Sequence, residues 1–255
     1  ELFAMHLPEE YYAANEDITS DCLIGGDVHG NEPSHHIPYL YAWTSQPWKT
    51  QYWVREVMNK MYKIDLTGCG TALITPFKNG EVDYDAFAAL VDRQVEAGID
   101  FLVPLGTTGE TPCLEDEERI RILQSAKEHS KGVPVVVGGG TNSLQHTIRS
   151  MKMLEPYGVD AFLIVVPYYN KPTQEGQYQY FKAVAESTDK PIVLYNVPGR
   201  TGANMTAETA LRLAEIPNIV AIKEASGNRE QIEQILAGAP EGFAVLSGND
   251  DDTLW

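Results

Sequence analysis

Residues 192–223 read IVLYNVPGRTGANMTAETALRLAEIPNIVAIK, and they contain the clearest signal of the fold class. It begins with an apolar, β-branched run at Ile192–Tyr195 and closes with a second one at Ile219–Ile222. Between the two runs, Ala207–Ala214 has the apolar spacing of an amphipathic helix. Two apolar strands joined by a helix are typical of a parallel β–α–β unit, because a parallel crossover needs a connection of about this length.

The same alternation extends over the rest of residues 66–255. Further apolar runs predict strands at Thr71–Thr75, Phe101–Leu105, Val133–Val137, Phe162–Val166 and Phe243–Leu246. Further amphipathic segments predict helices at Asp85–Ala97, Glu115–Ser130, Leu144–Tyr157, Glu175–Ser187 and Glu230–Leu236. Strands that are apolar throughout are typical of a parallel sheet that is buried on both faces. The sequence therefore predicts a run of parallel strands alternating with helices.

A doubly wound sheet and a (β/α)8 barrel both fit this alternation. Polar or glycine-rich residues follow several strands at the same end, at 106–110, 138–142, 168–170, 196–198 and 223–224. A barrel gathers the loops after all its strands around one mouth, whereas an open sheet uses those near its switch point. We therefore predict an α/β fold of the (β/α)8 TIM-barrel type. It is truncated to about seven strands, because the pattern lacks an eighth strand and its helix.

Residues 1–65 differ in composition from the remainder. They hold three of the four Trp and four of the six His, whereas residues 66–255 are rich in Val, Ile, Ala and Gly. We expect a mostly irregular N-terminal segment over 1–65, with one helix near Trp48–Met61 that Thr44 or Ser45 caps. Residues 66–255 are expected to form the incomplete barrel.

Charge and composition argue against several classes of partner. Lys and Arg number 19 against 36 Asp and Glu, and the net charge of −17 disfavours nucleic acid or an anionic membrane. The three Cys are widely spaced, which suits neither a disulfide framework nor a zinc site. Gly138–Gly140 lacks a dinucleotide fingerprint and predicts a close-packed loop. No apolar run approaches the ~20 residues of a membrane span, and Glu1–Glu10 lacks the features of a signal peptide. We expect a cytoplasmic protein with neither cofactor nor metal.

Lys223 is the most informative residue for chemistry. It follows the strand Ile219–Ile222, where a partly desolvated lysine has a lowered pKa and attacks a ketone as the free amine, giving a Schiff base. Tyr195 ends the neighbouring strand, where its phenol can transfer protons. The alternative is a lysine that reaches solvent or pairs with Glu224.

Two loops supply candidate ligands for carboxylates. The hydroxyls of Thr107 and Thr108 and the backbone N–H groups around them can hold one carboxylate. Arg200 can bind a second one bidentately. Each loop also has an ordinary structural interpretation. The loop with Thr107 and Thr108 can be a common Gly/Thr turn, and Arg200 can be a loop arginine that faces solvent.

These residues lie in motifs that resemble the family of dihydrodipicolinate synthase, pyruvate-dependent class I aldolases that include N-acetylneuraminate lyase. The motifs are GTALITPF at 70–77, GTTGE at 106–110, PYYNKP at 167–172, YNVPGRTG at 195–202, IKEA at 222–225 and LSGND at 246–250. The resemblance implies a lyase that condenses pyruvate with L-aspartate 4-semialdehyde to 4-hydroxy-tetrahydrodipicolinate, in lysine and diaminopimelate biosynthesis. It implies no cofactor.

The resemblance also assigns roles to residues. It implies that Lys223 forms the Schiff base with pyruvate and that Tyr195 shuttles protons. Thr107 and Thr108 bind the pyruvate carboxylate, and a threonine hydroxyl links Tyr195 to Tyr169. The matching tyrosine crosses a dimer interface, which implies a homodimer or homotetramer. Substrate-binding roles follow for Arg200, which holds the carboxylate of aspartate semialdehyde, and for Gly248.

Residues 1–62 resemble a different family. The segments DITS at 17–20, HGNEPSHHIPYLY at 29–41 and QPWKTQ at 46–51 are similar to family-92 glycoside hydrolases, which are calcium-dependent α-mannosidases. In that resemblance Glu32 matches the general acid, and Asp250 and Asp251 are the remaining candidates for the base that inverting hydrolysis needs. His29, Glu32, His35 and His36 also suggest a metal cluster, but Pro33 breaks the helical spacing of such clusters, so no metal is predicted.

Three alternatives stay open beside the synthase. The chain is a sibling pyruvate aldolase that acts on another aldehyde and does not need Arg200, or an inactive chimeric fragment, or, more remotely, a piece of a calcium-dependent α-mannosidase.

Overall fold

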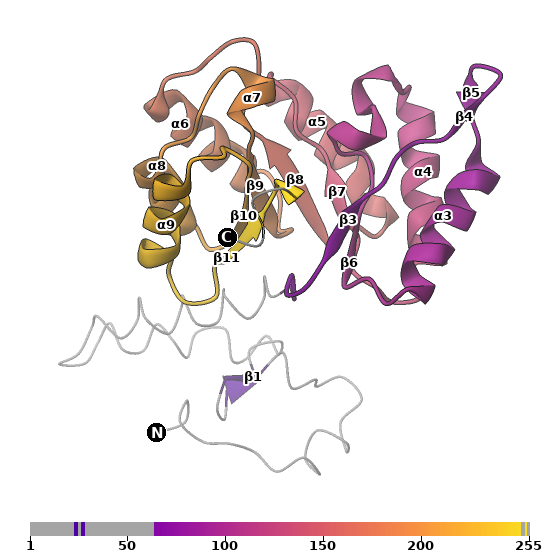
Figure 1. Ribbon diagram of the computed structural model, residues 1–255, viewed down its shortest axis with the longest axis horizontal. Coiled ribbons are helices and arrows are strands. Elements are labelled where there is room, and N and C mark those ends of the chain that lie inside the picture. Colours follow the sequence, from indigo (N-terminus) through magenta and orange to yellow (C-terminus); the bar gives the residue numbers. More distant parts are fainter. Residues whose placement is uncertain (1–22, 25–26, 29–63, 251–252, 254–255) are drawn as a thin grey trace. The chain divides into compact units, whose positions relative to one another are not determined.

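The computed structural model describes residues 23–24, 27–28, 64–250 and 253 (Figure 1). The chain divides into two units, Glu1–Lys63 and Ile64–Trp255. In the first unit, β1 (Leu23–Ile24) and β2 (Asp27–Val28) form an antiparallel pair within the segment that the sequence predicts to be mostly irregular. The helix predicted near Trp48–Met61 lies outside the described residues.

Parallel strands in chain order form the framework of the second unit. β3 (Gly70–Ala72) pairs with β6 (Phe101–Val103). A five-stranded sheet follows, in the order β7 (Val136–Gly138), β8 (Ala161–Val165), β9 (Ile192–Asn196), β10 (Ile219–Glu224) and β11 (Ala244–Ser247). A parallel bridge between Leu102 and Val135 joins β6 to the chain before β7. All seven predicted strands are present, and the predicted parallel α/β architecture is confirmed.

Six of the helices lie where the apolar spacing predicted them. They are α3 (Tyr84–Glu96), α4 (Asp116–His129), α5 (Leu144–Leu154), α6 (Gln174–Ala185), α8 (Ala207–Ala214) and α9 (Arg229–Gly238). Side-chain caps begin several of them: Thr173 accepts from Gly176 N at the start of α6, and Asn228 accepts from Gln231 N at the start of α9. The helices succeed the strands along the chain and flank the sheet (Figure 1).

Short elements were missed. The hairpin β4 (Phe77–Lys78) and β5 (Glu81–Val82) turns at Asn79 and Gly80, both with positive φ, which is the preferred chemistry of a two-residue hairpin loop. The Asn-Gly pair was therefore an available signal. The single helical turn α7 (Pro198–Thr201) and the 3-10 turns at Thr107–Gly109, Thr111–Cys113 and Glu155–Tyr157 are too short to have a readable period.

Each face of the sheet carries its own apolar cluster. Alternate strand residues such as Phe162, Leu194 and Ile222 pack with the helices. The residues between them, among them Val193 and Ala221, form a second cluster to which the helices contribute no residue. Because strand side chains alternate in direction, the central strands β6 to β9 are buried on both faces, which explains their continuous apolar runs.

Within the described residues the arc does not close, since β3 and β11 each pair with one neighbouring strand. This agrees with the prediction of a truncated barrel. The helices of the described part of the chain are too short or too polar to span a bilayer.

Candidate active site

Lys223 and Tyr195 lie side by side at the carboxyl ends of their strands. The register of β9 and β10 pairs Lys223 with Tyr195, and that of β10 and β11 pairs Lys223 with Leu246. Lys223 Nζ lies 4.6 Å from the centroid of the Tyr195 ring. The structure therefore brings together the two residues from which the sequence predicted a Schiff base and its proton carrier.

The surroundings of Lys223 favour its neutral form. Burial lowers the pKa of its amine, the Asp250 carboxylate raises it in part, and the positive charge of Arg200 lowers it further. Glu224, the alternative partner, faces the other side of the sheet, where its carboxylate accepts hydrogen bonds from Asn196 and Gln231. A lowered pKa is the direction that favours an amine nucleophile.

Tyr195 keeps its proton at neutral pH. The side chain is 7% exposed, and burial raises the pKa of the phenol, an effect that the charge of Arg200 partly offsets. A phenol beside an amine of lowered pKa can donate a proton and take it back.

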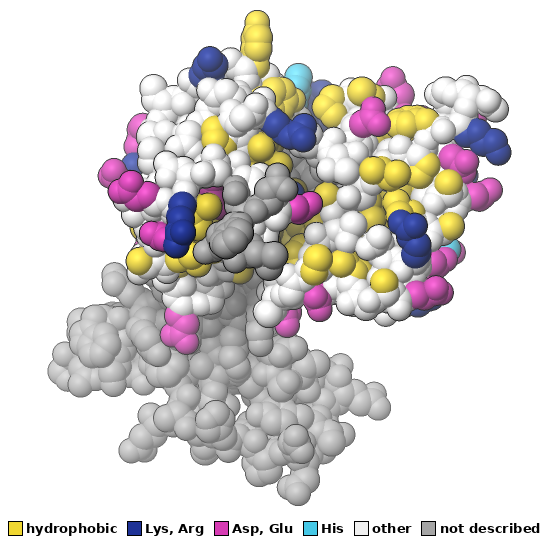
Figure 2. All heavy atoms as spheres, in the orientation of Figure 1, with side chains coloured by type: hydrophobic (Ala, Val, Ile, Leu, Met, Phe, Trp, Pro, Cys, Tyr) yellow, Lys and Arg dark blue, Asp and Glu magenta, His cyan; other side chains and the backbone are white. Residues whose placement is uncertain are grey.

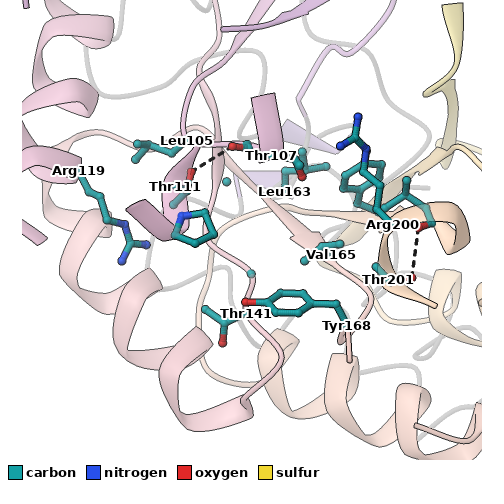
Figure 3. A pocket seen from close by; sticks show the side chains of 16 residues that line it. Leu105, Thr107, Thr111, Arg119, Thr141, Leu163, Val165, Tyr168, Arg200 and Thr201 are labelled. Carbon is teal, nitrogen blue, oxygen red and sulfur yellow. Dashed lines mark hydrogen bonds between the residues drawn. The ribbon is translucent and has the colours of Figure 1, made fainter. Parts of the chain in front are cut away.

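A pocket of about 320 Å³ opens beside Tyr195 (Figure 3). Its walls come from the loops after β6, β7, β8 and β9, as expected for a mouth at the carboxyl ends of parallel strands. Three predicted site residues line it, namely Thr107, Tyr195 and Arg200. Lys223 is not among the lining residues, but it contacts the pocket wall through the Tyr195 ring.

The Gly-Thr-Thr-Gly-Glu loop folds as a 3-10 turn, Thr107–Gly109, at one side of the pocket. The Thr75 hydroxyl donates to Gly109 O at 2.7 Å, and the Thr111 hydroxyl donates to Gly106 O at 3.1 Å (Figure 3). These bonds fix the turn to the segment that follows β3 and to the next 3-10 turn, Thr111–Cys113. Thr107 enters the pocket lining, whereas Thr108 is exposed outside it.

Tyr169 does not reach the pocket of its own chain. Its side chain is 86% exposed, its φ is 68°, and its backbone N donates to Thr201 O at 3.2 Å. The neighbouring Tyr168 lines the pocket instead (Figure 3). The adjacent aromatic in the same motif was the available signal for Tyr168. The role of Tyr169 across an interface stays a prediction.

Glycines let the strand ends approach one another. A Cβ at Gly248 would lie 2.8 Å from Ala225 Cβ and 3.2 Å from Lys223 Cε, so this position packs directly against the lysine. A Cβ at Gly138 would lie 1.8 Å from Leu105 O, and one at Gly140 would lie 2.7 Å from Val165 N. The close-packed loop expected at Gly138–Gly140 is confirmed, and two of its glycines line the pocket.

No group of three or more His, Cys, Asp and Glu side chains in the described part of the chain is arranged to hold a metal ion. His29, Glu32, His35 and His36 lie outside the described residues. Basic side chains on the described residues of the face in Figure 2 are scattered among acidic ones.

Comparison with known proteins matches the two parts of the sequence to two different families. The model of the dihydrodipicolinate synthetase family matches residues 65–255, three quarters of the chain. The chain belongs to the dihydrodipicolinate synthetase family. The model of the glycosyl hydrolase family 92 catalytic domain matches residues 2–71, as the resemblance of the N-terminal segment implied. The boundary predicted at residue 65 stays an interpretation.

Relatives in the dihydrodipicolinate synthetase family are close in sequence. The 4-hydroxy-tetrahydrodipicolinate synthase of Koribacter versatilis is 56% identical over 192 residues, which cover 74% of this chain and 64% of that protein. That of Bacillus subtilis is 52% identical over 187 residues, which cover 72% and 64%. The chain therefore spans just under two thirds of these relatives.

Solved structures of the family show the same fold. The 4-hydroxy-tetrahydrodipicolinate synthase of Methylacidiphilum fumariolicum is 43% identical with a TM-score of 0.72, covering 74% of this chain and 64% of its own. The dihydrodipicolinate synthase of Aquifex aeolicus is 43% identical with a TM-score of 0.71, covering 73% and 64%.

Proposed function

We propose that this chain is a Schiff-base lyase that condenses pyruvate with L-aspartate 4-semialdehyde to 4-hydroxy-tetrahydrodipicolinate, a step of lysine and diaminopimelate biosynthesis. Relatives that carry the synthase name at 50–56% identity support the activity. The observation that carries the proposal is the position of Lys223, whose amine lies over the Tyr195 ring where burial lowers its pKa.

The chemistry follows from this pair. The neutral amine of Lys223 attacks the C2 carbonyl of pyruvate, and water leaves as the imine forms. Loss of a proton from the methyl carbon gives an enamine, which forms a carbon–carbon bond to the aldehyde carbon of the second substrate, and the aldehyde oxygen takes a proton to become the 4-hydroxyl group. The amine of the semialdehyde then attacks the imine carbon, which closes the ring and releases Lys223 as the free amine. The phenol of Tyr195 donates the proton that the departing oxygen takes and recovers it afterwards.

The remaining predicted residues surround this pair. Thr107 and Thr108 bind the pyruvate carboxylate on the 3-10 turn, and Arg200 on α7 binds the carboxylate of the semialdehyde. Gly248 leaves room beside Lys223. No cofactor is needed, since the lysine itself activates the ketone.

Assembly is part of the proposal. The exposed Tyr169 ring suits a contact with a second copy of the chain, which fits the expected homodimer or homotetramer. A cytoplasmic location is proposed with the same enzyme class.

The test is borohydride reduction in the presence of pyruvate, followed by intact mass and peptide mapping. We expect one pyruvyl group on Lys223, none in Lys223→Ala, and an unchanged adduct in Lys78→Ala, which removes an exposed lysine from the hairpin. Undiminished trapping in Lys223→Ala would refute the assignment of the nucleophile. A folded chain that forms no adduct would favour the inactive chimera.

A screen of acceptor aldehydes then separates the synthase from a sibling aldolase. Turnover of L-aspartate 4-semialdehyde that falls in Arg200→Ala supports the synthase. Preference for another aldehyde, without dependence on Arg200, supports the sibling.

A further inference from the structure

A set of buried polar side chains lies on the opposite side of the sheet from Lys223 and Tyr195. Asn196 and Glu224 are the next residues along β9 and β10, and strand alternation turns them toward the helices. The register pairs Asn196 with Glu224 as it pairs Tyr195 with Lys223. Asn196 has no exposed surface and Glu224 is 2% exposed. The side chains of Asn196 and Glu224 thus join β9 to β10 one residue beyond Tyr195 and Lys223.

Hydrogen bonds tie this pair to the surrounding loops. Asn196 Nδ2 donates to Glu224 Oε2 at 3.0 Å, and Gln231 Nε2 from α9 donates to the same oxygen at 3.3 Å. The backbone N of Ser226 donates to Glu224 Oε1 at 2.7 Å. Asn204 closes the set, because its Oδ1 accepts from Asn196 at 2.9 Å and its Nδ2 donates to Gln231 Oε1 at 2.8 Å.

Stability alone is a poor explanation for the Glu224 carboxylate. Its hydrogen-bond donors are neutral, and within the part of the chain that the structure describes no ion pair includes it. Burial of a carboxylate without a cationic partner is costly, and apolar replacements of buried ionic groups are often neutral or stabilising. A fully hydrogen-bonded set is directional, which suits it to fixing a geometry.

The backbone carbonyl groups of Asn196 and Glu224 also accept hydrogen bonds from residues beside the site. Ala225 N donates to Asn196 O at 2.8 Å, and Gly248 N donates to Glu224 O at 2.7 Å. Gly248 in turn packs against Lys223. A shift of Glu224 would therefore move both the end of β10 and the segment that contacts the lysine.

We propose that Asn196 and Glu224 are positioning residues, which hold the Lys223 amine over the Tyr195 ring by hydrogen bonds on the far side of the sheet. The proposal rests on the proposed function, since it takes Lys223 as the nucleophile.

Glu224→Gln tests it in the full chain. The glutamine keeps the size of the side chain but sets an amide N–H₂ against the donors of Asn196 and Gln231. The readout is the rate at which borohydride traps the pyruvyl adduct on Lys223, at saturating pyruvate and well below the unfolding temperature of each variant. We expect trapping to slow roughly tenfold or more, because a displacement near 1 Å is enough for such losses.

Asn218→Ala is the matched control. Asn218 precedes the other end of β10, is buried, and donates to Ala185 O at 2.9 Å and Thr188 O at 3.1 Å. Its loss removes a buried amide from the residue that precedes the same strand, and the trapping rate should stay within about twofold of the parent.

Two further variants guard against a trivial result. Glu224→Gln combined with Gln231→Glu restores an acceptor opposite the new amide, and we expect it to recover most of the rate. Should Glu224→Gln not fold, Asn204→Ala removes the half-buried residue that bonds both Asn196 and Gln231, and trapping should slow by a smaller factor.

A second readout needs no pyruvate. Reductive methylation of Lys223 with formaldehyde follows the free amine, and in Glu224→Gln its pH midpoint should rise by roughly half a unit as the lysine moves toward water. If Lys223 of the parent chain is methylated but forms no pyruvyl adduct, the proposed function fails. The pH midpoint of methylation in Glu224→Gln then tests by itself whether Asn196 and Glu224 position the lysine. If folded Glu224→Gln keeps the parental rate and midpoint, positioning is overturned while the proposed function stands.

Discussion

Lys223 and Tyr195 meet because the parallel register sets one opposite the other on the face away from the helices. A slip of one residue would turn Lys223 toward the helices and Glu224 toward the pocket, since neighbouring strand residues face opposite ways. The buried residues Leu194 and Ile222 resist such a slip, because it would remove them from the helix-packed core. The apolar pattern of two strands therefore holds Lys223 and Tyr195 together.

Gly248→Ala tests the packing against the lysine. The added methyl group would lie 3.2 Å from Lys223 Cε and 2.8 Å from Ala225 Cβ, so the lysine or the strand end must move. We expect pyruvate trapping to slow roughly tenfold. Gly199→Ala adds the same methyl group where no atom lies within 4 Å, and it should trap at the parental rate. Equal rates in the two variants would contradict the close packing at Gly248.

The pH profile of trapping tests the charges around Lys223. Because burial and Arg200 lower the pKa of the amine while Asp250 raises it, the profile should have its midpoint below the ordinary lysine value of about 10.4. Asp250→Asn removes the charge that raises the pKa, so its midpoint should move to lower pH. Arg200→Ala removes a charge that lowers it, so its midpoint should move to higher pH. Shifts of the same sign in both variants would rule out this account.

At the scale of elements, the site depends on how strands end and helices begin. Leu105 adopts a φ of 58° after β6. Because Gly138 has no side chain, the carbonyl oxygen of Leu105 can lie close to the backbone of β7. The pocket therefore opens at a point where the backbones of two strand ends are almost in contact. Side-chain N-caps begin helices that follow the strands, such as Thr173 at the start of α6 and Asn228 at the start of α9.

Thr173→Ala tests one of these helix starts. The Thr173 hydroxyl accepts from Gly176 N at 3.2 Å at the start of α6, and its loss should cost about 1 kcal/mol in the free energy of unfolding. Thr173→Ser keeps the hydroxyl and should retain nearly all of the stability. Denaturant unfolding of both variants gives the comparison, and an alanine variant as stable as the parent would show that the cap contributes nothing.

At the scale of the whole molecule, the chain joins sequences that match two different families. Residues 65–255 carry every residue assigned to pyruvate chemistry, whereas Glu32 belongs to the segment that matches the glycosyl hydrolase. The two assignments make separate predictions.

Glu32→Gln should leave pyruvate trapping on Lys223 within about twofold of the parent, because no step of the proposed reaction uses this carboxyl. Lys223→Ala, measured beside it, should abolish trapping. Calcium-dependent release of mannose from an α-mannoside, lost in Glu32→Gln, would show instead that the N-terminal segment has its own activity.

Most of the fold was predictable from local pattern. Apolar runs such as Ile192–Tyr195 and helical spacing such as Ala207–Ala214 repeat through residues 66–255, and each is a property of a few neighbouring residues. Short elements escaped prediction: the hairpin at Asn79 and Gly80 spans too few residues for a period, although its turn chemistry was legible. Lys223 was recognisable because a lysine that ends a buried strand is chemically unusual.

By itself, the sequence determined the parallel α/β class and the order of strands and helices, and it pointed to Lys223 and Tyr195 as candidates for a reactive pair. Which side chains meet depends on the tertiary structure: Lys223 lies over Tyr195, Thr107 lines the pocket while Thr108 does not, and Tyr169 is exposed outside it. The tertiary structure also decided that Asn196 and Glu224 share one buried network. The physical reason is that periodicity reports which face of an element is buried, whereas contacts between strands depend on register and on the close approach of backbones.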